Sequence, residues 1–373
     1  MYSILILGGY GNFGKRIVKS LTHLDNLNIL IAGRDRKKAE RLTQQLSASS
    51  TAILTPVELD INAFSFEAQL GELKPNTVIH TSGPFQSQNY RVAEACIKLE
   101  CHYIDLADDR RFVCDIITLN EQAKTKNVLV VSGASTVPGL SSVVIDHYSS
   151  QFNTISSIDL AIAPGNKAER GEATVNAILS YTGQAFEVFS HGEWRQVYGW
   201  MDARKVNFGD IVGQRWLANV DVPDLELFPS RYSVKESVRF QAGLELAIMH
   251  LPMVAMAWFA KLHLVKNWAP LTKPIVTLSN FFLKWGTDQG GMRIIIKGLD
   301  KNNKAKTLTW SLYADNGIGP YTPTLSTIII AKNLITGDIN QTGAVSCLGL
   351  FSYDELSAHA ETLGIYFKEE IIG

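Results

Sequence analysis

Tyr2-Ser-Ile-Leu-Ile-Leu-Gly-Gly-Tyr-Gly-Asn-Phe-Gly14 begins with a short apolar run and ends in the spacing Gly9-x-Gly11-x-x-Gly14. A helical pattern follows at once, from Lys15 to Leu24. A dinucleotide pyrophosphate requires this order of strand, glycine turn and helix: Gly9 allows the tight turn, Gly11 lets the backbone approach the phosphates, and Gly14 lets the helix pack closely. The helix N-terminus adds free N–H groups and a positive dipole end. The stretch therefore predicts dinucleotide binding.

Apolar runs alternate with helical patterns through the first third of the chain. The candidate strands are Ser3–Leu7, Asn28–Ala32, Ala52–Leu59, Thr77–Thr81, Tyr103–Leu106 and Val128–Val131. The helical patterns between them include Arg36–Leu46, Tyr90–Leu99 and Phe112–Lys124. Strands separated by helical crossovers predict an α/β fold, a doubly wound parallel sheet of the Rossmann type with helices on both faces. Ligands of such a sheet bind outside the carboxyl ends of the strands, so the residues after each strand are site candidates.

The second strand is followed by Gly33-Arg34-Asp35-Arg36. A site specific for NAD(H) usually places a carboxylate at this strand end to bind the ribose 2′-hydroxyl, and Gly33 takes that position here. Arg34 can stack on the adenine or pair with a 2′-phosphate, and Arg36 adds positive charge. The stretch favours NADP(H) over NAD(H). The alternative is that both arginines are solvated residues at the start of a helix that Asp35 caps.

Three further strand ends carry polar or small residues. Asp60 is placed either to reach the adenine or to cap the next helix. The turn Ser82-Gly83-Pro84-Phe85 brings the backbone close to the nicotinamide ribose, or is an ordinary turn. Asp105 or Asp108 is placed to orient the substrate or the nicotinamide, and Asp109 to cap a helix. The candidate cofactor-binding residues are Gly9, Tyr10, Gly11, Asn12, Phe13, Gly14, Gly33, Arg34, Asp35, Asp60, Ser82, Gly83, Pro84 and Asp105.

The pattern changes from about residue 155. Alternating segments predict a second, α+β domain built on a mostly antiparallel sheet, and two apolar helical patterns predict helices packed on it. The strands are Ser157–Ala163, Met292–Gly298 and Leu308–Ala314, and the helices are Ala173–Tyr181 and Leu325–Leu334. We expect a dinucleotide-binding domain at residues 1–135 and a substrate and dimerisation domain at residues 136–345. Residues 346–373 are expected to form a helix and a strand, with a return to the first domain as one option.

The composition is that of an ordinary globular protein of 373 residues. A net charge of −1 leaves no basic stripe for nucleic acid, so we expect no nucleic-acid partner. The four cysteines have no metal-ligand spacing, so we expect no metal site, and Cys96 and Cys101 are expected to be buried thiols in a reducing compartment. The first residues enter a strand without a signal-peptide pattern, which favours a cytoplasmic protein.

One segment, Leu251–Val265, is apolar but too short and too interrupted to span a bilayer. One interpretation is a buried helix or a subunit interface. The other is an interfacial helix whose Trp258, Phe259 and Trp268 enter the lipid headgroups beside two lysines, so that Leu251–Trp268 forms a peripheral membrane contact.

Several motifs spread along the chain belong together. They are Gly9–Gly14, Ala32-Gly33-Arg34, Ser82–Phe85 running on to Ala95-Cys96 and His102–Asp105, and Val137-Pro138-Gly139-Leu140-Ser141. Further motifs are Arg170–Thr174, Gly290-Gly291-Met292 and Gly319-Pro320-Tyr321. In this set the chain resembles the saccharopine dehydrogenase-like family of NADP-binding oxidoreductases, in its short bacterial form. The likeness spans nearly the whole chain.

The resemblance implies a Rossmann domain followed by an α/β domain that covers the nicotinamide and often serves dimerisation. It also implies NADP(H) and, for the founding members, chemistry on a carbon–nitrogen bond of an amino-acid adduct. We therefore expect an NADP(H)-dependent oxidoreductase that acts on a small substrate bearing an amino or carboxyl group, and that forms a homodimer through the second domain. The alternatives are an NADP-binding sensor without turnover and a peripheral membrane protein.

A reductase acting on an imine needs an anchoring cation and a proton donor near the nicotinamide. Arg170 is the candidate anchor, because it lies at the start of the helical pattern Glu172–Tyr181. Asp108, His191 and Tyr321 are the candidate acids or bases. Each has a structural alternative: a surface ion pair for Arg170, a loop position for His191 and a packing role for Tyr321.

Overall fold

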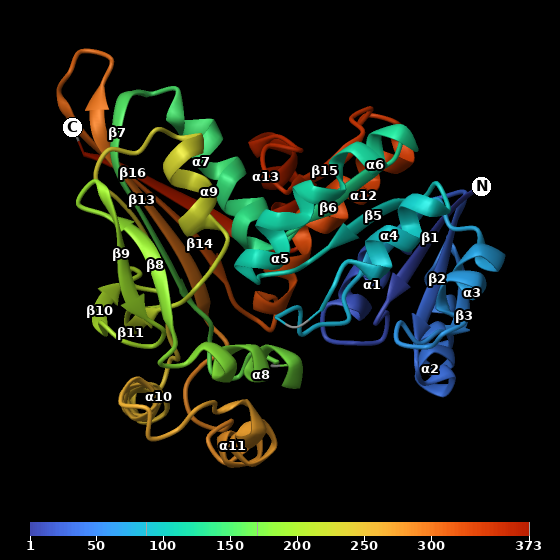
Figure 1. The fold of residues 1–373 in the computed structure, drawn as a ribbon, viewed down its shortest axis with the longest axis horizontal. Coiled ribbons are helices and arrows are strands. Elements are labelled where there is room, and N and C mark those ends of the chain that lie inside the picture. The colour runs from blue at the N-terminus through green and yellow to red at the C-terminus, as the bar shows by residue number, and fades with distance from the viewer. Residues whose placement is uncertain (87, 170, 373) are drawn as a thin grey trace. The chain divides into compact units, whose positions relative to one another are not determined.

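The structure, a computed structural model, describes residues 1–86, 88–169 and 171–372 (Figure 1). The chain forms two compact units, residues 1–140 with 323–351 and residues 141–322 with 352–373. The predicted domains, residues 1–135, 136–345 and 346–373, stay a prediction. The two compact units of the structure are bounded at other residues.

The first unit holds a sheet of seven strands in the order β15-β6-β5-β4-β1-β2-β3, and every strand pair in it is parallel. The strands are β1 (Tyr2–Leu7), β2 (Leu27–Gly33), β3 (Ile53–Glu58), β4 (Thr77–His80), β5 (His102–Asp105), β6 (Leu129–Ser132) and β15 (Gly343–Ser346). The helices are α1 (Gly14–Leu21), α2 (Arg36–Ser47), α3 (Phe66–Leu73), α4 (Arg91–Lys98), α5 (Arg110–Cys114), η1 (Asp115–Leu119), α6 (Asn120–Thr125), η2 (Thr136–Leu140) and α12 (Leu325–Thr336). The predicted doubly wound sheet is confirmed.

The central strands of this sheet are buried on both faces, and β1 carries a continuous apolar run. Ile4, Leu5 and Ile6 follow one another in β1 and have no exposed surface. Such continuous apolar runs are typical of parallel strands with helices on both sides of the sheet. All six predicted strands are present, and Gly343–Ser346 adds a seventh beside β6, which the prediction missed.

The second unit is built on a nine-stranded sheet whose main path runs β10-β11-β12-β7-β13-β14-β16, with β8 pairing both β12 and β9. Only the pair of β7 and β12 is parallel among those described, so the prediction of a mostly antiparallel sheet is confirmed. The strands are β7 (Phe152–Ala163), β8 (Ala185–Ser190), β9 (Glu193–Tyr198), β10 (Arg204–Asn207), β11 (Gln214–Asn219), β12 (Ser237–Ala242), β13 (Gly290–Asp300), β14 (Ala305–Ala314) and β16 (Tyr366–Ile372). The helices are α7 (Ser141–Ser149), α8 (Glu172–Tyr181), α9 (Asp224–Arg231), α10 (Ala247–Lys261), η3 (Ala269–Leu271), α11 (Thr272–Asn280) and α13 (Tyr353–Thr362), and η4 (Gly319–Thr324) leads back toward the first unit.

One predicted helix forms but lies in the other unit. Leu325–Leu334 was expected to pack on the antiparallel sheet, and that expectation is wrong: α12 belongs to the first unit. There the hydroxyl of Ser326 donates to the carbonyl of Ser135 at 2.9 Å, and that of Thr327 to the carbonyl of Ala134 at 2.6 Å. The helix is apolar on most of its surface, so its sequence predicts burial without indicating which core receives it.

The C-terminal residues divide between the two units. β15 extends the parallel sheet, whereas β16 pairs antiparallel with β14, Tyr366 standing opposite Tyr313 and Ile372 opposite Thr307. Cys96 and Cys101 are buried, as expected. Cys347 is also buried and Cys114 is half-buried.

Candidate functional site

The glycine turn follows β1 and leads directly into α1. The residue in the left-handed region is Gly8, with φ +74°, so the prediction that Gly9 provides the tight turn is corrected. A Cβ on Gly14 would lie 2.2 Å from the carbonyl oxygen of Gly8, and a Cβ on Gly9 would lie 2.9 Å from that of Ile6. Contacts this short exclude any side chain, so both positions require glycine for close packing of turn, strand and helix.

The start of α1 leaves donors available to an anion. Within the described residues, the backbone N–H groups of Phe13 and Gly14 make no hydrogen bond. Below the turn, the buried guanidinium of Arg16 donates to the backbone carbonyl and the side-chain oxygen of Asn12. Free N–H groups at a helix N-terminus, next to the glycine backbone of the turn, fit a pyrophosphate.

The turn lies at the point where the strand order of the sheet reverses. β1 pairs with β2 on one side and with β4 on the other. The hydroxyl of Thr81, directly after β4, donates to the carbonyls of Leu7 at 2.8 Å and Gly8 at 3.2 Å. A Cβ on Gly8 would lie 2.8 Å from the side-chain oxygens of Thr81 and Ser82. Ligands of doubly wound sheets bind at this switch point, and Thr81 holds the glycine turn there.

Tyr10 connects the glycine turn to the end of β2. Its hydroxyl accepts a hydrogen bond from the backbone N–H of Asp35 at 2.9 Å, and a Cβ on Gly33 would lie 2.5 Å from the same hydroxyl oxygen. Asp35 in turn caps α2, because its carboxylate accepts from the backbone N–H of Lys38 at 3.2 Å. The capping role predicted as an alternative for Asp35 is therefore present.

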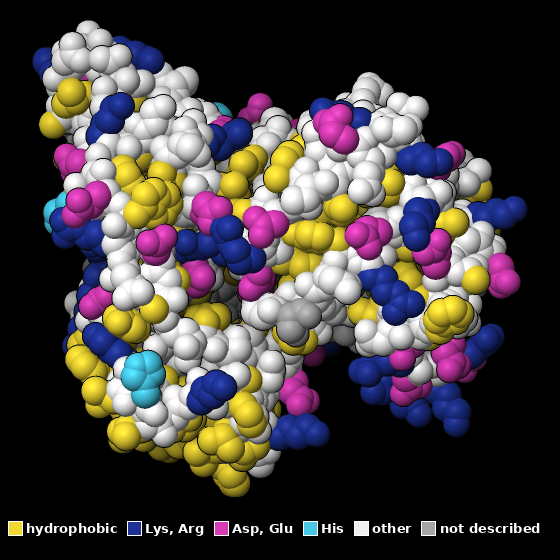
Figure 2. Space-filling model, viewed as in Figure 1, with side chains coloured by type: hydrophobic (Ala, Val, Ile, Leu, Met, Phe, Trp, Pro, Cys, Tyr) yellow, Lys and Arg dark blue, Asp and Glu magenta, His cyan; other side chains and the backbone are white. Residues whose placement is uncertain are grey.

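Positive charge surrounds this strand end. Arg34 is exposed and takes part in none of the ion pairs found among the described residues. Arg36 pairs with Glu40 at 3.0 Å on the exposed side of α2, as expected for a solvated helix residue. Figure 2 shows Lys and Arg side chains gathered over this helix. Arg34 is thus the arginine that is free to meet a phosphate beside Tyr10 and Gly33.

The loop after β4 is fastened by the side chain of Gln88, which was not among the predicted site residues. The amide nitrogen of Gln88 donates to the carbonyl of Ser82 at 2.8 Å and to that of Pro84 at 2.9 Å. Phe85 packs against His80 with ring centroids 5.1 Å apart. The sequence could have indicated Thr81 and Gln88 by their positions, because both are polar residues that flank a strand end and a Gly-Pro turn.

Asp105 is wholly buried at the end of β5. One carboxylate oxygen accepts from the backbone N–H of Ala107 at 2.9 Å, from the hydroxyl of Ser132 at 3.0 Å and from the N–H of Gly133 at 2.8 Å. Burial raises the pKa of Asp105 to about 6, against the opposing effect of these hydrogen bonds. Asp105 therefore joins the ends of β5 and β6 and positions the site. Its side chain is buried and has no surface that a ligand could contact.

Nearby aspartates have different surroundings. Asp60 accepts from the N–H of Asn62 at 3.0 Å in a turn, while α3 begins only at Phe66, so the alternative that Asp60 caps the next helix is wrong. Asp109 caps α5 by accepting from the N–H of Phe112 at 2.9 Å, as predicted. Asp108 is exposed, and its carboxylate accepts from the side chain of Gln86 at 3.3 Å.

The remaining catalytic candidates are dispersed. Arg170 lies outside the described residues. His191 is exposed in the turn between β8 and β9, with φ +56°, and its Nδ1 lies 2.9 Å from the hydroxyl of Ser190. Tyr321 is half-buried in η4. No cluster of three His, Cys, Asp or Glu side chains suited to a metal ion occurs in the part of the chain that the structure describes.

Comparison with known proteins agrees with this geometry. Residues 4–131 match the family model described as the saccharopine dehydrogenase NADP binding domain. Among solved structures, saccharopine dehydrogenase (L-Glu forming) from Saccharomyces cerevisiae aligns with a TM-score of 0.72 at 13% identity and covers 100% of both chains. An engineered D-amino acid dehydrogenase bound to NADP+ covers 95% of this chain and 96% of its own, with a TM-score of 0.47 at 14% identity. An amine dehydrogenase from Mycobacterium smegmatis covers 93% and 94%, with a TM-score of 0.48 at 8% identity.

The class of protein follows from the glycine turn at the switch point and the family match. Residues 4–131 carry a saccharopine dehydrogenase-type NADP-binding domain, which supports an oxidoreductase with NADP(H) as its cofactor, as predicted. The fold of the whole chain is that of the yeast saccharopine dehydrogenase. The resemblance stated from the motifs is confirmed at this level.

Proposed function

We propose that this oxidoreductase acts on a small substrate bearing an amino or carboxyl group, at a carbon–nitrogen bond. The observation that carries the proposal is the cradle at the carboxyl edge of the parallel sheet, where Phe13 and Gly14 offer free N–H groups and Arg34 stands exposed at the end of β2. The domain match supports the cofactor, and the substrate class is taken from the likeness of the whole fold to saccharopine dehydrogenase.

The bound cofactor would supply or accept a hydride, so the protein has to bind, orient and exchange a proton. We assign the pyrophosphate to the turn Gly9–Gly14 and the 2′-phosphate to Arg34, with Asp60 toward the adenine. Gly33 and Tyr10 shape the space beside Arg34. The backbone of Ser82-Gly83-Pro84, held by Gln88, would lie along the nicotinamide ribose. Asp105 keeps the ends of β5 and β6 together.

The substrate contacts are part of the same proposal. Arg170 would anchor a substrate carboxylate, because a guanidinium forms paired hydrogen bonds with that group. Asp108, which is exposed on the unit that carries the glycine turn, would exchange the proton. An Asp108→Asn variant that keeps full turnover would remove Asp108 from this role, whereas loss of turnover with unchanged NADPH affinity would support it.

We also propose a cytoplasmic homodimer that associates through the second domain, as expected from the sequence. Sedimentation equilibrium of the purified chain measures its mass in solution directly. A single species with the mass of one chain, at micromolar concentration, would contradict the dimer.

The central experiment measures NADPH binding and turnover in the same preparation. Gly11→Asp places a carboxylate beside the pyrophosphate and should weaken NADPH binding by roughly 100-fold in calorimetry. The matched control is Ala358→Asp, which adds the same charge at an exposed position of α13 and should leave the affinity unchanged. Unchanged affinity in Gly11→Asp would overturn the assigned site.

Turnover separates the enzyme from a sensor. Oxidation of NADPH is followed with 2-oxo acids supplied together with ammonium or amino acids, and reduction of NADP+ with amino acids alone. Steady turnover with any of these substrates supports action at a carbon–nitrogen bond. Tight NADPH binding without turnover in every combination would favour the sensor.

A further inference from the structure

The helices α10, η3 and α11 and their connections, residues 246–286, form what we call the helical segment of the second unit. Of the twenty-two large hydrophobic side chains that are exposed among the described residues, eleven lie in this segment. They are Ile248, Leu251, Trp258, Phe259, Leu262, Leu264, Leu271, Leu278, Phe281, Leu283 and Trp285. Figure 2 shows hydrophobic side chains gathered over α10 and α11. An apolar concentration of this kind marks an interaction surface.

Helix α10 has two apolar faces with different neighbours. His250, Met253, Ala257 and Ala260 recur at helical spacing and are buried. This face packs into a cluster with residues of α8 and β11. The opposite face carries Ile248, Leu251, Trp258, Phe259 and Leu262, which are 47 to 61% exposed. The buried face packs α10 onto the rest of the second unit. The exposed face leaves large apolar side chains in contact with water, which is unfavourable unless another surface covers them.

The charge of the segment is one-sided. From Leu246 to Thr287 the sequence contains no Asp or Glu and four lysines, Lys261, Lys266, Lys273 and Lys284. None of the four joins an ion pair among the described residues. The ammonium of Lys261 instead lies 4.2 Å from the ring centroid of Tyr198 and 5.1 Å from that of Trp258. A partner that meets this surface therefore faces lysines for which the segment itself supplies no counter-charge.

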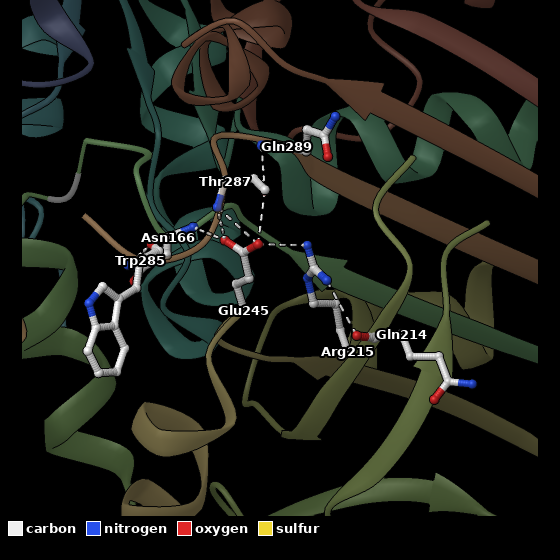
Figure 3. A network of polar contacts seen from close by, with 7 residues as sticks. All are labelled: Asn166, Gln214, Arg215, Glu245, Trp285, Thr287 and Gln289. Atoms are coloured by element: carbon white, nitrogen blue, oxygen red, sulfur yellow. Dashed lines mark hydrogen bonds and ion pairs between the residues drawn. The ribbon is translucent and has the colours of Figure 1, made fainter. Parts of the chain in front are cut away.

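Both ends of the segment are fastened to the sheet by one carboxylate (Figure 3). Glu245, just before α10, accepts from the N–H of Asn166 at 2.7 Å and from the N–H of Thr287 at 2.9 Å. It also pairs with the guanidinium of Arg215 at 3.2 Å, and both side chains are nearly buried. The side chain of Asn166 donates to the carbonyl of Trp285 at 2.9 Å. The exposed face is thus presented by a fixed element.

The earlier membrane interpretation is corrected at one residue. One of the two alternatives for this segment placed Trp268 in the lipid headgroups with Trp258 and Phe259, but its indole N–H donates to the carbonyl of Met256 at 3.0 Å and the residue is half-buried. Exposed aromatic rings are contributed instead by Phe281 and Trp285 of the α11 region, beyond the predicted limit of Leu251–Trp268. No helix in the described part of the chain is long and apolar enough to cross a bilayer.

We propose that the helical segment docks on the surface of an anionic lipid bilayer. Exposed Trp and Phe side chains enter the headgroup region, Leu and Ile side chains reach the acyl boundary, and lysines meet the acidic headgroups. The charge selects this occupant over a second copy of the chain. Two copies related by a twofold axis would place lysines against lysines with no acidic residue of the segment to compensate.

The test is sedimentation of the full chain with vesicles of phosphatidylcholine, with and without phosphatidylserine. We expect binding to the phosphatidylserine vesicles and a loss of at least about tenfold in Trp258→Glu/Phe259→Glu, because two charged side chains replace exposed aromatic ones. Phe64→Glu, at an exposed hydrophobic position of the first unit, is the control and should bind like the unaltered chain.

The lysines are tested separately. Lys266→Gln/Lys273→Gln should lower partitioning onto phosphatidylserine vesicles by roughly 30-fold, because each lysine near an acidic surface contributes a factor of about five. Lys297→Gln/Lys368→Gln removes the same charge from exposed positions of β13 and β16 and should have little effect. Equal loss in both variants would contradict docking through this segment.

Two results would overturn the proposal. One is the absence of binding to phosphatidylserine vesicles by the unaltered chain. The other is a dimer in sedimentation equilibrium that Trp258→Glu/Phe259→Glu converts to a monomer, which would give the surface to a second copy. The proposal is independent of the oxidoreductase assignment, because vesicle binding is measured without cofactor or substrate and NADPH affinity should be the same in all these variants.

Discussion

The hydroxyl of Tyr10 and the backbone N–H of Asp35 form a hydrogen bond of 2.9 Å that closes the glycine turn onto the end of β2. The ring of Tyr10 fills the space that a side chain on Gly33 would need, so that a Cβ there would lie 2.5 to 2.6 Å from its atoms. The two ends of the proposed cofactor site, for pyrophosphate and for 2′-phosphate, are therefore linked by one side chain.

Gly33→Ala should destabilise the protein because the new methyl group collides with Tyr10. We expect a loss of about 1–3 kcal/mol in the free energy of unfolding, measured by urea denaturation, and weaker NADPH binding. In a Tyr10→Ala background the same substitution should have little further effect, since the colliding ring is gone. Gly319→Ala, where nothing lies within 4 Å of the added Cβ, is the control. Equal costs in both backgrounds would contradict the packing of Tyr10 on Gly33.

Arg34→Gln should change the choice between cofactors. Loss of a charged hydrogen-bond donor to a 2′-phosphate is expected to raise the Kd for NADPH by roughly 10- to 100-fold. The Kd for NADH, which has no 2′-phosphate, should change little. Arg41→Gln removes an exposed arginine from α2, the helix that follows Arg34, and is the matched control. Calorimetry with both cofactors decides, and a parallel weakening of NADPH and NADH would exclude a specific 2′-phosphate contact.

The buried carboxyl of Asp105 should make stability depend on pH. Burial raises its folded-state pKa to about 6, so the native protein binds more protons than the unfolded chain between the ordinary aspartate pKa and this value. The contribution of Asp105 is therefore most favourable below about pH 4 and falls by about 3 kcal/mol as the pH rises through 6. Asp105→Asn should remove this dependence.

The measurement for Asp105 is urea unfolding from pH 4 to pH 7.5. The difference between the unaltered chain and Asp105→Asn should shift in favour of the variant as the pH rises. Asp25→Asn, at a surface position without burial, should follow the unaltered chain at every pH. A constant difference across the range would show that the carboxyl of Asp105 keeps an ordinary pKa.

Glu245→Gln should destabilise the second unit. The substitution leaves the nearly buried guanidinium of Arg215 without its counter-charge, which typically costs about 3–5 kcal/mol. The double variant Glu245→Gln/Arg215→Met should cost less than the sum of the two single changes, because it also removes the stranded charge. Urea unfolding gives the coupling, and limited proteolysis should show faster cleavage within residues 246–286 in Glu245→Gln. Strict additivity would contradict a coupled pair.

Local sequence patterns predicted the elements whose burial they reflect. The strands around β1 are apolar on both faces, so their positions could be read from single runs of residues. β15 could not, because it has four residues and pairs with β6 from more than two hundred residues away. The helix Leu325–Leu334 could be predicted because it is apolar. An apolar surface does not indicate which of the two cores the helix packs into, so its place in the first unit could not be predicted.

The candidate site shows the same division. The spacing from Gly9 to Gly14 identified the turn, but it did not indicate the positive φ of Gly8 or the hydrogen bond that its carbonyl accepts from Thr81 at the neighbouring strand end. Asp105 and Asp108 are the same residue type three positions apart. Asp105 is buried because it lies at the end of β5 beside β6, whereas Asp108 lies beyond the strand and is exposed. Roles that arise from contacts between distant segments have no local pattern.

The return of the chain to β15 bears on how this protein is made. β6 ends at Ser132, yet its outer neighbour in the sheet begins at Gly343, after almost all of the second sheet. At ribosomal rates of roughly 5–20 residues per second, the edge of β6 waits about 10–40 s for its partner during translation. An open edge of apolar parallel sheet can recruit other strands, so nascent chains of this protein are expected to need a chaperone during that interval.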